Sequence, residues 1–116
     1  LLMGRNGPAF LAYRNFAVYT EWNKSLNYAT TAAYLAIRIE GAPALGRGRA
    51  PVTPLEPATL KELQSLLTRR IADAGVPDGR LGTATRTAIR QAQVRFGMPA
   101  DAYPSLELLE RLRQGR

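Results

Sequence analysis

The stretch Pro57-Ala-Thr-Leu-Lys-Glu-Leu-Gln-Ser-Leu-Leu-Thr-Arg-Arg-Ile-Ala-Asp-Ala-Gly75 decides the fold class. Its apolar residues recur three and four positions apart, which is the spacing of one face of an α-helix. The expected buried face consists of Leu60, Leu63, Leu67, Ile71 and Ala74. Pro57 suits the first turn of this helix, and Gly75 is expected to end it. No useful length of sequence alternates between apolar and polar residues, so we predict an all-α protein.

Two further helices are expected after this one. A turn at Val76-Pro77-Asp78-Gly79 and a second turn at Gly82 lead to a helix for which Thr83 can act as N-cap. Gly97 is expected to close that helix, and Ser105 to cap the last one. Their expected buried residues are Ala88, Ile89, Ala92, Phe96, Leu108, Leu109 and Leu112. Three short helices with tight loops predict a compact mini-bundle over residues 55–116.

Residues 1–41 carry a different helical pattern. Asn15 is a plausible N-cap for a helix whose aromatic face holds Phe16, Tyr19 and Trp22. Ser25 can cap a second helix, and Gly41 can end it. The apolar stripe of that second helix is rich in small residues: Leu26, Ala29, Ala32, Ala33, Ala36 and Ile37. This small-residue stripe predicts close packing against protein that the chain itself does not supply.

Between these two regions lies a segment with no apolar periodicity. From Gly41 to Pro54 there are three glycines, three prolines and two arginines. Such a mixture predicts a linker of intermediate stiffness over residues 42–54, which would let the two halves reorient.

Composition narrows the possible functions. The 116 residues include no cysteine and no histidine, which excludes disulfides and a zinc site with His or Cys ligands, and we expect no metal and no cofactor. The net charge is +7, but the arginines are dispersed from Arg5 to Arg116, so we do not expect a nucleic-acid partner. No apolar run approaches the length of about 18 residues that a membrane helix needs. The chain opens on Leu1 without an initiator methionine, and we expect the protein to continue upstream.

The C-terminal region resembles the peptidoglycan-binding domain family. That family pairs a D-G-x-x-G-x-x-T turn with an F-Q-x-x-x-G-L stretch, and the first motif is met here by Asp78, Gly79, Gly82 and Thr85. In the second motif Gln93 and Gly97 match, while Ala92 replaces the aromatic residue and Met98 the leucine. The segment Asp101-Ala102 stands where a second Asp-Gly is common. From the residues themselves we expect Gly79 and Gly82 to supply unusual backbone angles and Thr85 to bond to backbone. Binding to the cell wall is what the resemblance implies.

The N-terminal region resembles the end of the catalytic domain of membrane-bound lytic murein transglycosylases of the B type. The resemblance rests on the runs Gly7-Pro8-Ala9-Phe10-Leu11, Arg14-Asn15-Phe16, Trp22-Asn23-Lys24-Ser25 and Tyr28-Ala29. Together the two resemblances span nearly the whole chain, in the order found in many such enzymes.

This resemblance implies a function and a site. The family cleaves the MurNAc–GlcNAc bond of peptidoglycan without water and leaves 1,6-anhydromuramic ends, unlike hydrolases that use two carboxylates. Trp22, Asn23 and Tyr28 stand where that family lines its sugar groove. The residues alone would favour a core position for Trp22, because it lies at helical spacing from Tyr19.

The catalytic acid of that family is a glutamate followed by serine. None of the six glutamates here precedes a serine. Glu21 lies beside the proposed groove residues, but a solvated helix face explains it better. We therefore expect the acid upstream of residue 1 and expect this chain to be inactive alone.

The sequence is compatible with two hypotheses for the function. The chain is either the C-terminal part of a transglycosylase or a non-enzymatic peptidoglycan-binding adaptor, and only the first needs Trp22, Asn23 and Tyr28. Both imply peptidoglycan glycan strands as the partner and the periplasm or cell envelope as the location.

Overall fold

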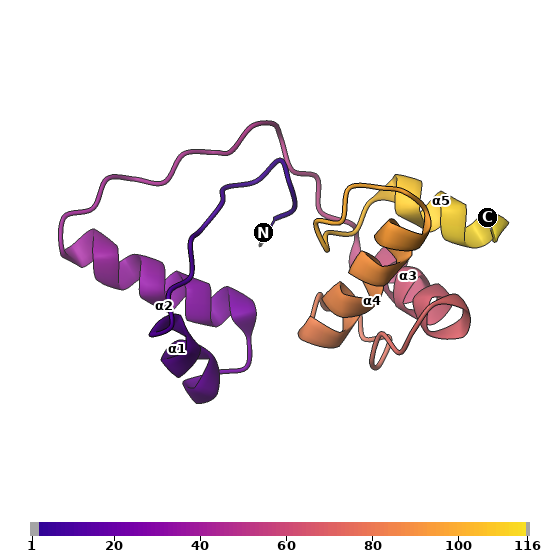
Figure 1. Ribbon diagram of the computed structural model, residues 1–116, viewed down its shortest axis with the longest axis horizontal. Helices are drawn as coiled ribbons and strands as arrows, with labels where there is room; N and C mark the ends of the chain where they lie inside the picture. The colour runs from indigo at the N-terminus through magenta and orange to yellow at the C-terminus, as the bar shows by residue number, and fades with distance from the viewer. Residues whose placement is uncertain (1–2, 116) are drawn as a thin grey trace.

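The computed structural model describes residues 3–115 of the chain, and within them it contains five helices and no strand. The helices are α1 (Phe16–Trp22), α2 (Leu26–Ile39), α3 (Pro57–Arg70), α4 (Thr83–Arg95) and α5 (Leu106–Gln114). Helices α1 and α2 pack on each other at one end of the molecule, and α3 packs on α4 and α5 at the other (Figure 1). The predicted all-α class is confirmed.

Helices α1 and α2 form an open pair with little core. Ser25 caps α2 as predicted, because its Oγ accepts the N–H of Tyr28 over 3.4 Å. Asn15 sits at the N-cap of α1, but its side chain makes no capping bond. Across these two helices of the described structure only Ala29 is buried, and Leu35, Ile37 and Ile39 are exposed. Within the small-residue stripe, Ala32, Ala33 and Ala36 are partly buried and Ile37 is exposed, so the described residues cover the stripe only in part.

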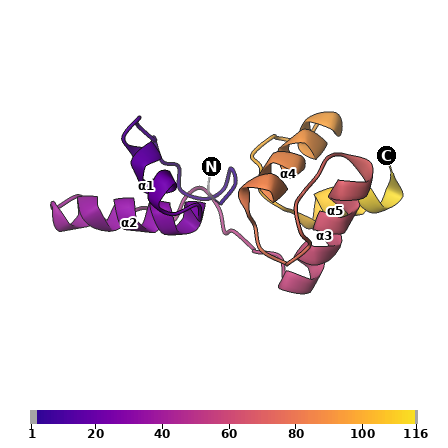
Figure 2. The same cartoon turned by 90° about the horizontal axis from the view of Figure 1, so that it is seen from below.

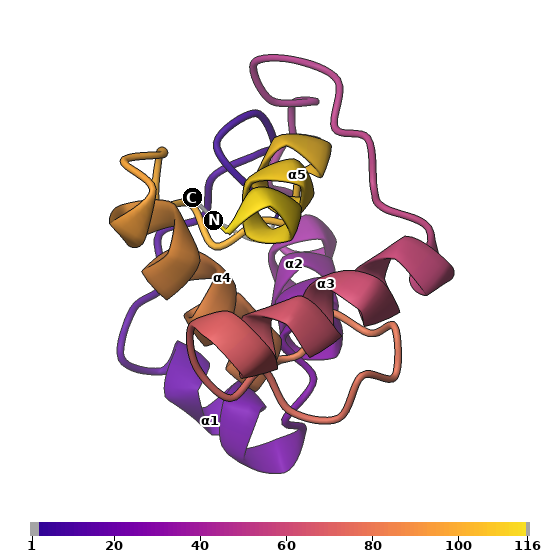
Figure 3. The ribbon, with the colours of Figure 1, turned by 90° about the vertical axis from the view of Figure 1, so that its right-hand side faces the viewer.

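Helices α3, α4 and α5 enclose the hydrophobic core of the chain. The buried residues are Leu60, Leu63, Leu67, Ala74, Ala88, Ile89, Ala92, Leu108, Leu109 and Leu112. Figure 3 shows α3 crossing below α5 with α4 at its side. Ile71 and Phe96, which were expected in the core, are only partly buried at its edge. Truncating a fully buried leucine to alanine costs about 2–5 kcal/mol in comparable cores. Since this core is small, the stability of the bundle should be sensitive to the loss of a single leucine such as Leu63.

Two helix ends differ from the sequence-based expectation. Helix α3 ends at Arg70 and not near Gly75, because the Leu67 carbonyl accepts both the Ile71 and the Ala72 N–H and so closes the last turn. Helix α4 begins at Thr83 with Gly82 at the N-cap, so Thr83 is not the cap. By contrast, Ser105 Oγ accepts the N–H of Leu108 over 3.2 Å and caps α5 as predicted.

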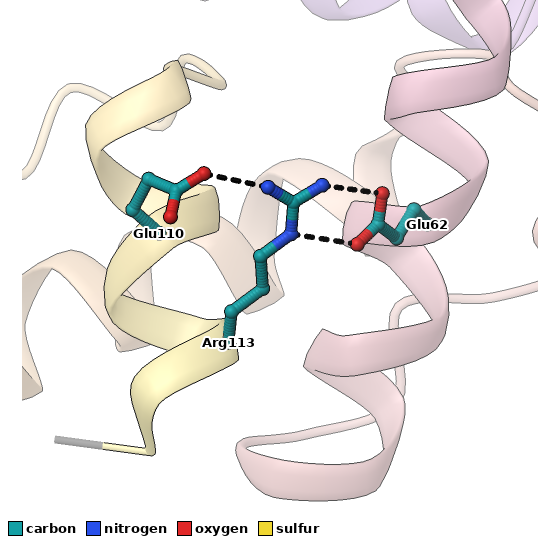
Figure 4. A network of polar contacts seen from close by, with 3 residues as sticks. All are labelled: Glu62, Glu110 and Arg113. Carbon is teal, nitrogen blue, oxygen red and sulfur yellow. Dashed lines mark hydrogen bonds and ion pairs between the residues drawn. The ribbon is translucent and has the colours of Figure 1, made fainter.

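An ion-pair network ties the end of α5 to α3. The Arg113 guanidinium donates to both carboxylate oxygens of Glu62, over 2.8 and 3.0 Å, and to Glu110 over 2.6 Å (Figure 4). Its hydrogen bonds lower the pKa of Glu62, and Glu62 in turn raises the pKa of Arg113. All three groups are partly exposed, so the network orients α5 more than it stabilises it.

The connection between the two helical groups is extended. It arches over the molecule in Figure 1, and the N-terminal loop lies between the two groups in Figures 1 and 2. The predicted division into residues 1–41, 42–54 and 55–116 stays a prediction, and residues 1, 2 and 116 lie outside the described residues. Among the helices described, none is both long and apolar enough to span a membrane.

Candidate functional site

The turn between α1 and α2 brings together the three residues proposed for sugar binding. The rings of Trp22 and Tyr28 lie with their centroids 5.4 Å apart and their planes tilted by 60°. Asn23 ends α1 in an extended conformation, and its Oδ1 accepts the N–H of Ser25 over 2.8 Å. The turn that places Trp22 beside Tyr28 is thus fixed by Asn23 on one side and Ser25 on the other.

This aromatic pair faces outward. Trp22 is 69% exposed and Tyr28 is 51% exposed. A core position for Trp22 is therefore wrong for this chain: its ring packs on Tyr28, whereas Phe16 and Tyr19 stack on each other with centroids 6.1 Å apart. Exposed rings of this kind can stack on the apolar faces of sugar rings, and a neighbouring carboxamide can bond to hydroxyl or acetamido groups.

Glu21, beside this pair, is poorly placed for acid catalysis. A glutamate that donates a proton near neutral pH is usually held in an apolar pocket. The Glu21 side chain is 81% exposed and forms an ion pair with Lys24 over 3.4 Å. It has the surroundings of a surface residue, as expected from the sequence.

A cavity of about 580 Å³ lies elsewhere, between the α1–α2 pair and α4. Its lining includes Phe10, Tyr13, Tyr19, Tyr34 and Arg86. None of the three proposed groove residues lines it. The aromatic turn is thus an open surface in this chain.

In the bundle, three of the four proposed turn residues, Asp78, Gly79 and Thr85, are hydrogen-bonded to one buried side chain, Gln64. Gln64 Nε2 donates to Asp78 Oδ1, the Arg80 carbonyl and Thr85 Oγ1, over 3.3, 3.1 and 3.0 Å. Its Oε1 accepts the N–H of Gly79 over 2.9 Å. Thr85 donates onward to the Ala74 carbonyl over 2.8 Å, which confirms its expected bond to backbone.

The two glycines of this turn differ. Gly79 has φ of +78°, as expected, and a Cβ there would lie 2.8 Å from the Pro57 carbonyl oxygen. Gly82 has φ of −83°, an ordinary angle, and open space where its Cβ would be. The expected unusual angle at Gly82 is therefore wrong, because Gly82 serves as the extended N-cap of α4.

A second loop repeats this arrangement around Gln93. Its Nε2 donates to Asp101 Oδ1 over 2.8 Å and to the Tyr103 carbonyl over 3.1 Å, and its Oε1 accepts the N–H of Ala102 over 2.9 Å. Ala102 occupies the place of Gly79 and takes a positive φ of 59°. The loop thus keeps the turn even though alanine stands where glycine is common.

Both loop aspartates are held in their charged form. The pKa of Asp78 is lowered by the Arg80 N–H and by Gln64. For Asp101, burial acts to raise the pKa, but hydrogen bonds from the Arg5 and Tyr103 N–H groups and from Gln93 outweigh it, so the pKa is lowered. The two carboxylates are acceptors that fix their loops.

Sequence reasoning did not identify Gln64 as a structural residue. A signal was present, because Gln64 lies on the leucine face of α3, directly after Leu63. A buried polar residue on an apolar face needs hydrogen-bond partners, and an Asp-containing turn nearby in the sequence is one source of them.

Both helical parts of the chain match known protein families. Residues 1–37 match the family described as "Transglycosylase SLT domain", and residues 57–112 match the family described as "Putative peptidoglycan binding domain". No curated protein matches the chain.

Two solved structures of SltB3 from Pseudomonas aeruginosa are similar to the chain. One is a complex with NAG-anhNAM-pentapeptide, 40% identical with a TM-score of 0.75, and the other a complex with NAG-NAM-pentapeptide, 42% identical with a TM-score of 0.74. In each case the likeness covers 97% of this chain and 30% of the SltB3 chain. The chain therefore carries a match to a transglycosylase SLT domain followed by a match to a peptidoglycan-binding domain. It spans about a third of the length of the solved relatives it matches.

Proposed function

We propose that the chain is the C-terminal part of a peptidoglycan lytic transglycosylase. In this proposal the α1–α2 turn supplies part of the groove that holds the glycan strand, and the α3–α5 bundle binds the cell wall. The observation that carries it is the exposed Trp22–Tyr28 pair beside Asn23, in a chain that matches a transglycosylase domain and then a peptidoglycan-binding domain.

Each groove residue has a distinct role in this proposal. Trp22 and Tyr28 stack on the apolar faces of sugar rings, and their tilt lets two rings contact different faces of one strand. The bond from Ser25 orients the Asn23 carboxamide, whose Nδ2 group can then donate to a hydroxyl or acetamido oxygen. Because the site is an open surface, the remaining wall of the groove would come from protein outside this chain.

The reaction is a non-hydrolytic cleavage of the MurNAc–GlcNAc bond. One carboxylic acid protonates the glycosidic oxygen, and the resulting carboxylate then removes the proton of the muramic 6-hydroxyl, whose oxygen closes the 1,6-anhydro ring. We place this acid outside the chain, because none of its glutamates precedes a serine and Glu21 is exposed and ion-paired. The chain alone is then a binding unit without activity.

The substrate also suggests where the protein works. Peptidoglycan lies in the cell envelope, and the family matched by residues 57–112 is described as a putative peptidoglycan-binding domain. We propose the periplasm as the location of the parent protein.

Analysis of the reaction products of the parent protein tests this proposal. Purified sacculi are incubated with the parent, and the released fragments are separated and weighed by mass spectrometry. We expect muropeptides with 1,6-anhydromuramic ends, each lighter by one water than the hydrolysis product. Products with free reducing ends would contradict the transglycosylase, and binding to sacculi without any cleavage would favour the adaptor.

A further inference from the structure

The loop around Gln93 is in contact with the N-terminal segment of the chain. The backbone N–H of Arg5 donates to Asp101 Oδ2 over 2.9 Å, across 96 positions of sequence. The other oxygen, Oδ1, accepts from Gln93 and from the Tyr103 N–H within its own loop. Asp101 therefore fixes its loop with one oxygen and holds the N-terminal segment with the other.

The backbone at Gly4 approaches this loop too closely for any side chain. Gly4 has φ of +69°, and a Cβ there would lie 2.7 Å from Tyr103 Cβ and 2.9 Å from Asp101 Oδ2. Such distances are shorter than real Cβ contacts, so glycine is needed for this approach.

The connection between the helical groups closes on the same segment. The Asn6 carbonyl accepts the N–H groups of Arg49 and Ala50, over 2.8 and 3.3 Å. Gly48, at φ of +88°, leaves no room for a Cβ beside the Gly7 backbone. Arg49 and Ala50 of the linker are thus held at the junction, whereas its composition predicted a tether of intermediate stiffness that lets the two halves reorient.

The equivalent loop around Gln64 shows that this contact is additional to the loop's own structure. Asp78 uses Oδ1 for Gln64 and for the Arg80 N–H, in the same way that Asp101 uses Oδ1 for Gln93 and the Tyr103 N–H. The bonds to Oδ1 are therefore enough to form the turn of the Asp78 loop. By the same pattern, the Asp101 loop does not need the bond from the Arg5 N–H to Oδ2 for its own turn.

We propose that the Asp101 loop is an interdomain docking site for the backbone of residues 4–6. By holding this segment, it fixes the α3–α5 bundle relative to the α1–α2 pair. The likeness to SltB3 covers 97% of the chain at a TM-score of 0.75, so both helical groups align with that structure in one superposition. If the proposed function holds, the aromatic turn and the wall-binding bundle contact peptidoglycan at a fixed separation.

Distance measurements between spin labels test the docking without any peptidoglycan. The chain has no cysteine, so Leu11→Cys and Gln91→Cys, both at exposed positions, place one label on each side of the junction. We expect a narrow distance distribution in the chain that carries these two labels and no other substitution. Asp101→Asn keeps Oδ1 but presents an N–H₂ group to the Arg5 N–H, so the width should increase by at least about twofold, toward that of a free tether. The matched control Asp78→Asn should leave the width unchanged.

A pair of glycine variants separates docking from folding of the bundle. Gly4→Ala and Gly41→Ala both place alanine at a positive φ, but only at Gly4 would the Cβ meet neighbouring atoms. Gly4→Ala should broaden the distribution with the melting of the bundle unchanged, and Gly41→Ala should not broaden it. Two results would overturn the docking site. One is a broad distance distribution in the labelled chain that carries only Leu11→Cys and Gln91→Cys, and the other is an unchanged width when Asp101→Asn or Gly4→Ala is added to it. Loss of sacculus binding would count against the proposed function alone.

Discussion

Gln64 on α3 and Gln93 on α4 occupy equivalent places in two loops built on one hydrogen-bond pattern. Each carboxamide donates to an aspartate Oδ1 and to a carbonyl two residues further on, and each accepts the N–H of the residue between them. Both glutamine side chains are buried. The bundle therefore rests on two internal carboxamides as well as on its leucines.

Replacing Gln64 should destabilise the bundle strongly. Gln64→Leu keeps the approximate volume but leaves the Gly79 N–H, the Arg80 carbonyl and Asp78 without this partner. Loss of several buried hydrogen bonds should lower the free energy of unfolding by about 2–4 kcal/mol. Urea unfolding followed by circular dichroism measures this. Ser65→Ala, at a partly exposed neighbour on the same helix, should change stability by less than about 0.5 kcal/mol.

The positive φ of both Ala102 and Gly79 predicts that glycine is favoured over alanine at the equivalent position of each loop. Ala102→Gly should raise the free energy of unfolding by about 1 kcal/mol, because an L-residue is strained at this angle. Gly79→Ala should lower it by more than about 1 kcal/mol, because the new Cβ also meets the Pro57 carbonyl. Thermal melts of the two variants give the comparison, and a destabilised Ala102→Gly would refute the strain at Ala102.

Acid should weaken the two loops. The folded pKa values of Asp78 and Asp101 are lowered, so their stabilisation is complete above the unfolded value of about 3.9 and is lost as pH falls through the folded values. The urea concentration at the unfolding midpoint should therefore decrease as the pH is lowered below about 4. In the double variant Asp78→Asn/Asp101→Asn the midpoint should depend less steeply on pH over this range. An equally steep dependence would assign the acid effect to other carboxylates.

Trp22 reports on sugar binding by its own fluorescence, because it is the sole tryptophan of the chain. Addition of a soluble NAG-NAM glycan should change its emission if a sugar stacks on the aromatic pair. Tyr28→Ala removes half of that pair and should weaken binding by about tenfold. Tyr13→Ala removes a more exposed tyrosine away from the turn and should have no effect. Equal effects of the two variants would argue against the proposed site.

Much of the fold could be predicted because its signals are local. Leucine spacing identified α3, and Ser25 and Ser105 were recognised as caps from their position before an apolar run. The junction of Arg5 with Asp101 could not be predicted in this way, since it joins positions 96 residues apart through a backbone N–H, which leaves no trace in residue type. The end of α3 was misjudged for a related reason: the buried Ala74 continues the periodic pattern although the helix has already ended at Arg70.

For the candidate site, the residues could be predicted from the sequence but the exposure of Trp22 could not. The grouping of Trp22, Asn23 and Tyr28 was implied by the resemblance to the transglycosylases, and in the structure the turn Asn23–Ser25 brings the three residues together. The outward exposure of Trp22 did not follow from its spacing, which alone favoured the core. Helical spacing identifies a face but does not say whether other protein covers it.

Sedimentation of the chain with purified sacculi, followed by mass spectrometry of the supernatant, tests whether the chain binds peptidoglycan without cleaving it. We expect the chain to pellet with the sacculi and the supernatant to hold no anhydro-muropeptides, because in our proposal the chain binds the glycan strand but lacks the catalytic acid. A chain that stays in the supernatant would contradict the wall-binding function. Anhydro-muropeptides released by the purified chain would contradict the placement of the acid outside it.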